Sequence, residues 1–143
     1  MFVLDSRLQQ DSLVLGEFPL CQLLLSKDAN YPWFILVPKR AGISELFELD
    51  AAEQQQLWQE TTLLAEALKA SYAADKMNVA TLGNVVSQLH MHVIVRTRED
   101  AAWPAPVWGK LPAQPYSEAQ LAEVMARLRS LLTDDFRFVQ EAS

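Results

Sequence analysis

A single long helical pattern, set between short runs of strand-forming residues, limits most strongly what this chain can fold into. Asp50 and Glu53 have the spacing of a capping box, and the apolar residues that follow recur at helical intervals to about Ala73. Strands joined by short turns pair antiparallel, whereas parallel strands need a longer crossover between them. We therefore expect an α+β fold with a mainly antiparallel sheet.

The expected sheet has about five strands, because turn residues such as Gly16-Glu17, Pro19 and the Asp75-Lys76 pair separate the apolar runs. A polar helix-compatible segment precedes them, and Ser117 with Gln120 opens a C-terminal helix. A short helical turn is expected between Pro38 and Asp50. The expected strands begin at Leu13 and then cover Leu20 to Leu25, Trp33 to Val37, Met77 to Leu82 and Gln88 to Arg96.

Length and composition point to one globular domain. The chain has 143 residues, and 50% of them are hydrophobic, which suffices for one core. We expect a single domain over residues 1–143, with its core at about 13–98 and a C-terminal extension at 99–143. The single cysteine, Cys21, lies in an apolar run and is expected in that core.

Charge and hydropathy exclude two classes of partner. The net charge of −6 argues against binding to a nucleic acid polymer, which needs lysine and arginine to displace counterions from phosphate. No basic stretch followed by an apolar one opens the sequence, and no window approaches ~18 uninterrupted apolar residues. We therefore expect a cytoplasmic protein with no membrane segment.

Both histidines of the chain fall in the last expected strand. Because side chains alternate along a strand, Gln88, His90 and His92 are expected on one face and the apolar residues between them on the other. Two neighbouring imidazoles suit phosphoryl or nucleotidyl transfer, since one can attack phosphorus while the other donates or takes a proton. The same spacing can also chelate a metal, or both rings can be structural groups with satisfied hydrogen bonds.

The stretch from Gln88 to Ile94 resembles the signature of the histidine triad (HIT) superfamily, His-φ-His-φ-His-φ-φ, with glutamine in the first position. The stretch from Trp33 to Arg40 is similar to the family's apolar strand ending in Pro-Lys, and Ile43 to Leu46 resembles the Ile-Ser-x-Leu after it. Gly83 to Val86 occupies the place of Gly-Gln-Ser/Thr-Val. The resemblance covers about residues 20–96.

A segment after that region, Trp103 to Gly109, resembles an extension of a proteobacterial subgroup of HIT proteins that also carries glutamine at the first triad position. Its two tryptophans can serve as hydrophobic anchors, as platforms for a nucleoside or as contacts to a partner subunit. HIT proteins are commonly homodimers, so the resemblance implies a homodimer here.

The resemblance also implies roles for individual residues. His90 matches the histidine that attacks the α-phosphate, and His92 matches the third histidine, which contacts that phosphate. Gln88 can form hydrogen bonds but cannot carry a proton back and forth. Asn78 and Asn84 resemble residues near the phosphate.

Ser26 lies near the family's ribose-binding residue. Lys39 and Arg40 can attract phosphate or simply be solvated.

The resulting hypothesis is a nucleotide hydrolase or nucleotidyl transferase without a cofactor or an obligatory metal. It acts on the α-phosphate of a nucleoside phosphoramidate, a dinucleoside polyphosphate or a related small nucleotide. The alternative hypothesis is a nucleotide-binding regulatory module with weak or no catalysis, because the first histidine of the triad is replaced by Gln88.

Overall fold

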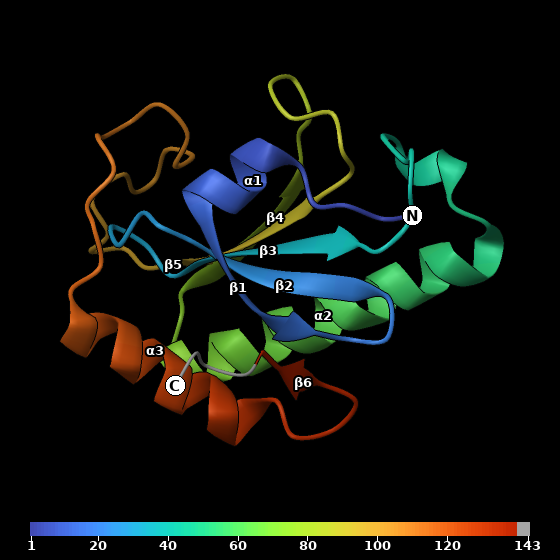
Figure 1. The fold of residues 1–143 in the computed structure, drawn as a ribbon. Helices are drawn as coiled ribbons and strands as arrows, with labels where there is room; N and C mark the ends of the chain where they lie inside the picture. The colour runs from blue at the N-terminus through green and yellow to red at the C-terminus, as the bar shows by residue number, and fades with distance from the viewer. Residues whose placement is uncertain (140–143) are drawn as a thin grey trace.

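A sheet of six strands forms the middle of the molecule, and every adjacent pair of strands runs antiparallel (Figure 1). The computed structural model describes residues 1–139. The order of strands across the sheet is β4-β5-β3-β2-β1-β6. Their bounds are β1 Ser12–Glu17, β2 Cys21–Ser26, β3 Trp33–Pro38, β4 Lys76–Thr81, β5 Met91–Arg96 and β6 Arg137–Phe138.

Two helices cover one face of this sheet and a short helix covers part of the other (Figure 1). Helix α2 (Ala51–Tyr72) begins with the expected capping box, in which Asp50 and Glu53 bond each other's main chain. Helix α3 (Glu118–Leu131) begins with the equivalent pair, Ser117 and Gln120. Helix α1 spans Ser6–Asp11, and the short 3-10 helix η1 spans Leu46–Glu48. The expected helices are therefore confirmed.

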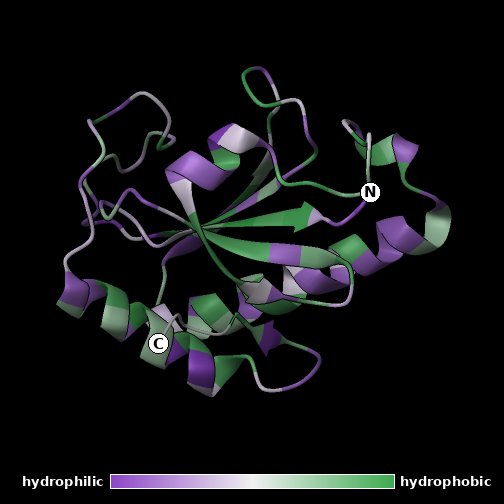
Figure 2. Cartoon of the chain, in the orientation of Figure 1, coloured by the Kyte–Doolittle hydropathy of each residue, from purple (hydrophilic) through white to green (hydrophobic). Residues whose placement is uncertain are grey.

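The core follows the alternation of strand side chains. On β5, Met91, Val93 and Val95 are buried in the main core, which also contains apolar residues of α2 and α3. A smaller apolar cluster joins Leu4 and Leu8 to residues of β2 and β3. Figure 2 shows mostly hydrophobic strands and a mixed pattern along α2, as expected for a helix with one solvated face. Within residues 1–139, no helix is both long and apolar enough to span a membrane.

Three details differ from the sequence-based expectation. The last long strand begins at Met91 and not at Gln88, because residues 82–90 form a loop between β4 and β5. Gly16 lies inside β1 at an irregularity in its pairing with β2, so the turn comes after Glu17. The sheet also gains β6, which pairs with β1 and is too short, at two residues, to leave a pattern in the sequence.

The segment between β5 and α3 lies over the face of β5 opposite α2. Arg96, only 1% exposed, holds it there through hydrogen bonds to both carboxylate oxygens of Asp100 and to the main-chain oxygen of Ala105. The Arg96 guanidinium also lies 5.6 Å from the centre of the Trp103 ring. This segment therefore has defined packing although it lacks regular secondary structure.

Candidate functional site

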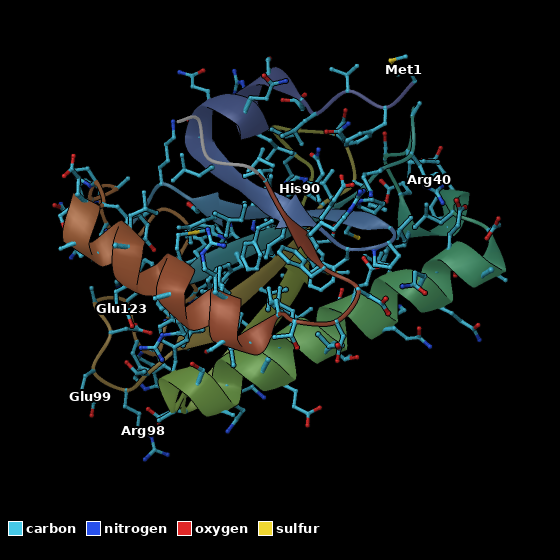
Figure 3. All side chains as sticks on the ribbon, turned by 60° about the horizontal axis from the view of Figure 1, so that its bottom comes forward. Met1, Arg40, His90, Arg98, Glu99 and Glu123 are labelled. Carbon is cyan, nitrogen blue, oxygen red and sulfur yellow. The ribbon has the colours of Figure 1, made fainter. Side chains whose placement is uncertain are left out.

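The two histidines lie side by side where the loop after β4 enters β5. His90 is the residue before the strand and His92 is its second residue. Both side chains are buried, and their ring centres lie 4.9 Å apart in an edge-to-face arrangement. In Figure 3, His90 lies toward the middle of the molecule, whereas the charged residues Arg40, Arg98 and Glu99 lie at its periphery. The expectation that the structure brings His90 and His92 together is confirmed.

The main chain fixes the proton of His90. Its Nδ1 lies 2.7 Å from the main-chain oxygen of Gln88. A carbonyl oxygen can only accept a hydrogen bond, so Nδ1 carries the proton and donates it. The neutral ring then has its lone pair on Nε2, which is the form that a nucleophilic imidazole needs.

An indole fixes the proton of His92 in the opposite way. The Nε1–H of Trp33 donates to Nδ1 of His92 over 2.9 Å. Because an indole N–H cannot accept, Nδ1 of His92 is unprotonated and the neutral ring carries its proton on Nε2. Burial lowers the pKa of His92 to about 3, with the neighbouring His90 as a second cause. His92 is therefore a neutral hydrogen-bond donor at neutral pH.

Trp108 completes an aromatic group around His92. Its ring centre lies 5.0 Å from that of His92 and 5.5 Å from that of Trp33, both nearly perpendicular. Such edge-to-face contacts hold the imidazole plane in one orientation. Trp108 is still 38% exposed, so one part of the indole packs on the site while another stays open to a ligand.

Two cavities meet at His92 and Trp108, which line both. The first has a volume of about 410 Å³ and is bordered by α1, by the ends of β1 and β2 and by the segment after β5. Its lining includes apolar side chains such as Leu8 and Ile35 and polar ones such as Ser26 and Asp28. The second, of about 330 Å³, is lined by His90, His92, Trp108 and residues 82–86 of the β4–β5 loop.

The other predicted site residues are distributed unevenly. Ser26 lines the first cavity and Asn84 lines the second, so both lie within reach of a ligand that touches the histidines. Asn78 lines neither cavity, and its side-chain oxygen accepts a hydrogen bond from Arg96 over 2.8 Å. Lys39 and Arg40 also line neither cavity and form ion pairs with Glu17 and Glu53.

Gln88 does not continue the row of polar side chains predicted for the strand. Since it precedes the strand, its amide is free of the strict alternation and reaches the N-terminal segment. Its Oε1 accepts from the main-chain N–H of Asp5 at 2.8 Å, and its Nε2 donates to the main-chain oxygen of Val3 at 2.9 Å. Within residues 1–139, the hydrogen bond between Gln88 and a histidine uses the main-chain oxygen of Gln88 and not its side chain.

Two residues of the site were missed by sequence reasoning. Trp33 was interpreted only as part of a central strand, and its bond to His92 depends on the pairing of β3 with β5. Ser12 lines the first cavity, is 4% exposed, and its hydroxyl finds no hydrogen-bond partner within residues 1–139. A buried hydroxyl without a partner in a cavity is available to a ligand.

Over the same residues, no group of three or more His, Cys, Asp or Glu side chains could hold a metal ion.

Comparisons with known proteins agree with this architecture. The chain is similar to histidine triad proteins of known structure from three bacteria. The protein from Marinobacter aquaeolei VT8 is 52% identical, with 92% of this chain and 96% of that chain covered and a TM-score of 0.90. The protein from Sinorhizobium meliloti 1021 is 45% identical, with 92% and 98% covered and a TM-score of 0.89.

The protein from Bradyrhizobium japonicum is 42% identical, with 92% of this chain and 98% of that chain covered and a TM-score of 0.90. A search of curated proteins found no match. The family model described as HIT domain matches residues 7–99, which include both histidines, both partners that fix their protons and most of the sheet. This chain therefore belongs to the histidine triad, or HIT domain, family.

Proposed function

We propose that this protein is a nucleotide hydrolase or nucleotidyl transferase that uses His90 as its nucleophile. Its substrate is a nucleoside phosphoramidate, a dinucleoside polyphosphate or a related small nucleotide, attacked at the α-phosphate. The observation that carries the proposal is the opposite protonation of two adjacent imidazoles. His90, which lines the second cavity, has a lone pair on Nε2, and His92, which lines both cavities, has a proton on Nε2.

The chemistry proceeds in two steps. In the first, the lone pair on Nε2 of His90 forms a bond to the α-phosphorus while the bond from phosphorus to the leaving group breaks. The leaving group departs with the bonding electrons and takes up a proton from solvent, which the attacking water returns in the second step. In the second, water or another acceptor attacks the same phosphorus, loses a proton and breaks the P–N bond, which regenerates His90 and releases the nucleotide product.

His92 stabilises the charge that develops on the phosphate oxygens. A neutral imidazole with its proton on Nε2 donates a hydrogen bond, and a donor that is already oriented needs no reorganisation as the charge grows. Asn84, which lines the same cavity as His90, is a second proposed donor. Ser26 in the other cavity is proposed to bind the ribose, beside the apolar lining that suits a base.

Release of nucleoside monophosphate tests this proposal. Adenosine and guanosine phosphoramidates and dinucleoside polyphosphates are incubated with the native protein, His90→Asn and a control, Trp58→Phe, which alters an exposed indole on α2. We expect turnover to fall at least about 100-fold in His90→Asn, because the nucleophile is lost, and to persist in the control. Unchanged turnover in His90→Asn would refute the assignment of the nucleophile.

A second function, a nucleotide-binding regulatory module, is favoured by one observation. The residue in the first triad position, Gln88, directs its side chain to Val3 and Asp5 and not to the histidines, so it supplies no proton relay. Binding of AMP or GMP by calorimetry, together with no release from any substrate of the panel, would support this function over catalysis.

A further inference from the structure

We infer that Gln88 is a positioning residue that fastens the N-terminal segment and thereby fixes the wall of the first cavity. The inference rests on the proposed function only for the identity of the ligand, a nucleotide. Its structural part starts from the two hydrogen bonds between the Gln88 amide and the main chain of Val3 and Asp5.

The side chain of Gln88 pairs with the N-terminal segment as a neighbouring strand would. Its oxygen accepts from one main-chain N–H and its nitrogen donates to a main-chain oxygen two residues earlier. A carboxylate offers only hydrogen-bond acceptors. A methionine, of similar length, has no donor and only a weak acceptor. Glutamine therefore suits this task at the position where the family signature has histidine.

The fastened segment leads directly into the cavity. We call the two hydrogen bonds of the Gln88 amide the clamp. Asp5 is the N-cap of α1, and its carboxylate accepts from the main-chain N–H of Arg7, so the clamp holds the first turn of that helix. Leu8 and Asp11 of α1 line the first cavity together with His92. Displacement of α1 would move two lining residues and leave the main-chain bond to His90 in place.

The same segment packs on the site through apolar contacts. Leu4 and Leu8 are buried in the smaller apolar cluster, and Phe2, Trp33 and Val86 pack against it. Trp33 bonds His92, and Val86 lines the second cavity. Gln88 thus links the N-terminal segment to the histidine pair. Its side chain forms hydrogen bonds with that segment, and its main-chain oxygen forms one with His90.

Amide hydrogen exchange tests the clamp without any substrate. In Gln88→Met, the protection of the Asp5 amide, measured by NMR, should fall at least about tenfold, because its acceptor is gone. Gln88→Glu keeps an acceptor for Asp5 but loses the donor to Val3, so its loss of protection should be smaller. Gln54→Met is the matched control, since Gln54 bonds the main-chain oxygen of Leu49 before α2. Unchanged protection of Asp5 in Gln88→Met would overturn the clamp.

Affinity and turnover test the consequence for the cavity. If Gln88 acts through α1, Gln88→Met should weaken binding of AMP and GMP roughly tenfold by calorimetry and raise KM by a similar factor. The fall in kcat should be clearly smaller. A fall in kcat with unchanged nucleotide affinity would show that Gln88 acts on the chemistry instead and would overturn the positioning role. Absence of nucleotide binding by the native protein would refute the proposed function, and with it the cavity role, while the exchange measurement still decides the clamp.

Discussion

His90 and His92 are the same residue type and are equally buried, but they differ in the hydrogen-bond partner of Nδ1. A main-chain oxygen accepts from Nδ1 of His90, whereas an indole donates to Nδ1 of His92. Because each partner can bond in only one direction, the two rings carry their protons on different nitrogens. One imidazole is thereby suited to attack and the other to donate.

In Trp33→Phe, the proton of His92 should no longer be restricted to Nε2. Phenylalanine keeps an aromatic ring beside Trp108 but removes the N–H that bonds Nδ1 of His92. In the native protein, imidazole ¹⁵N NMR should report an unprotonated Nδ1 and a protonated Nε2 at this residue. In the variant we expect a mixture of tautomers and roughly fivefold slower turnover, the loss of about one hydrogen bond. An unchanged His92 spectrum would show that Trp33 does not fix the proton.

The burial of His92 predicts a dependence of stability on pH. The pKa of His92 is lowered from its ordinary 6.5 to about 3, so the unfolded chain binds a proton in this window and the folded chain does not. The free energy of unfolding should therefore fall as the pH decreases from 6.5 toward 3. The free energy of unfolding is measured by urea unfolding at several pH values. Its slope against pH should be smaller in His92→Asn than in the native protein, by up to about 1.4 kcal/mol per pH unit. Identical slopes would contradict the lowered pKa.

The elements of the fold could be predicted where their signals are local. The helices α2 and α3 begin at capping boxes that lie within four residues, and the sequence shows both pairs. The hydrogen bonds of Gln88 with Val3 and Asp5 join residues more than eighty positions apart, and no local sequence pattern predicts them. For the same reason, His90 and His92 could be predicted from the sequence as a pair, whereas Trp33 as their partner could not.

The segment between β5 and α3 should depend on Arg96. Burial alone would raise the pKa of Asp100, but hydrogen bonds from Arg96 and the amides of Thr97 and Ala102 lower it below its ordinary value. Arg96→Met leaves this carboxylate without its cation and should lower the free energy of unfolding by about 3 kcal/mol or more. Proteolysis should then cut residues 97–113 faster than in the native protein.

The exposed Arg98 provides the matched control for that experiment. Arg98→Met should change stability by less than about 0.5 kcal/mol, as surface substitutions usually do. Equal effects of the two variants in urea unfolding would show that the Arg96 bonds do not organise the segment.

At the scale of the whole molecule, we propose a single domain over residues 1–143 and assembly into a homodimer. Within the described part of the chain, β4 is paired on one side only, so its other edge can bind a further strand. Val79 on this strand and Leu82 and Val85 just after it are exposed apolar residues. We propose that a second copy covers this edge and these exposed apolar residues.

Light scattering at micromolar concentration tests the dimer. The native protein should have twice the 16.1 kDa mass of one chain. Val79→Glu should shift the mass toward that of one chain, because it places a charge on the open edge. Phe47→Glu, at an exposed residue of η1, is the control and should leave the dimer intact. A monomer mass for the native protein would refute the homodimer.

Trapping the intermediate tests whether Nε2 of His90 forms a bond to phosphorus. Native protein is mixed with an adenosine phosphoramidate, quenched in alkaline denaturant to preserve the P–N bond, and digested for mass spectrometry. We expect adenylate attached to the peptide that contains His90, and no adduct in His90→Asn. Release of AMP by both proteins, without an adduct on His90 at any time of quenching, would contradict it.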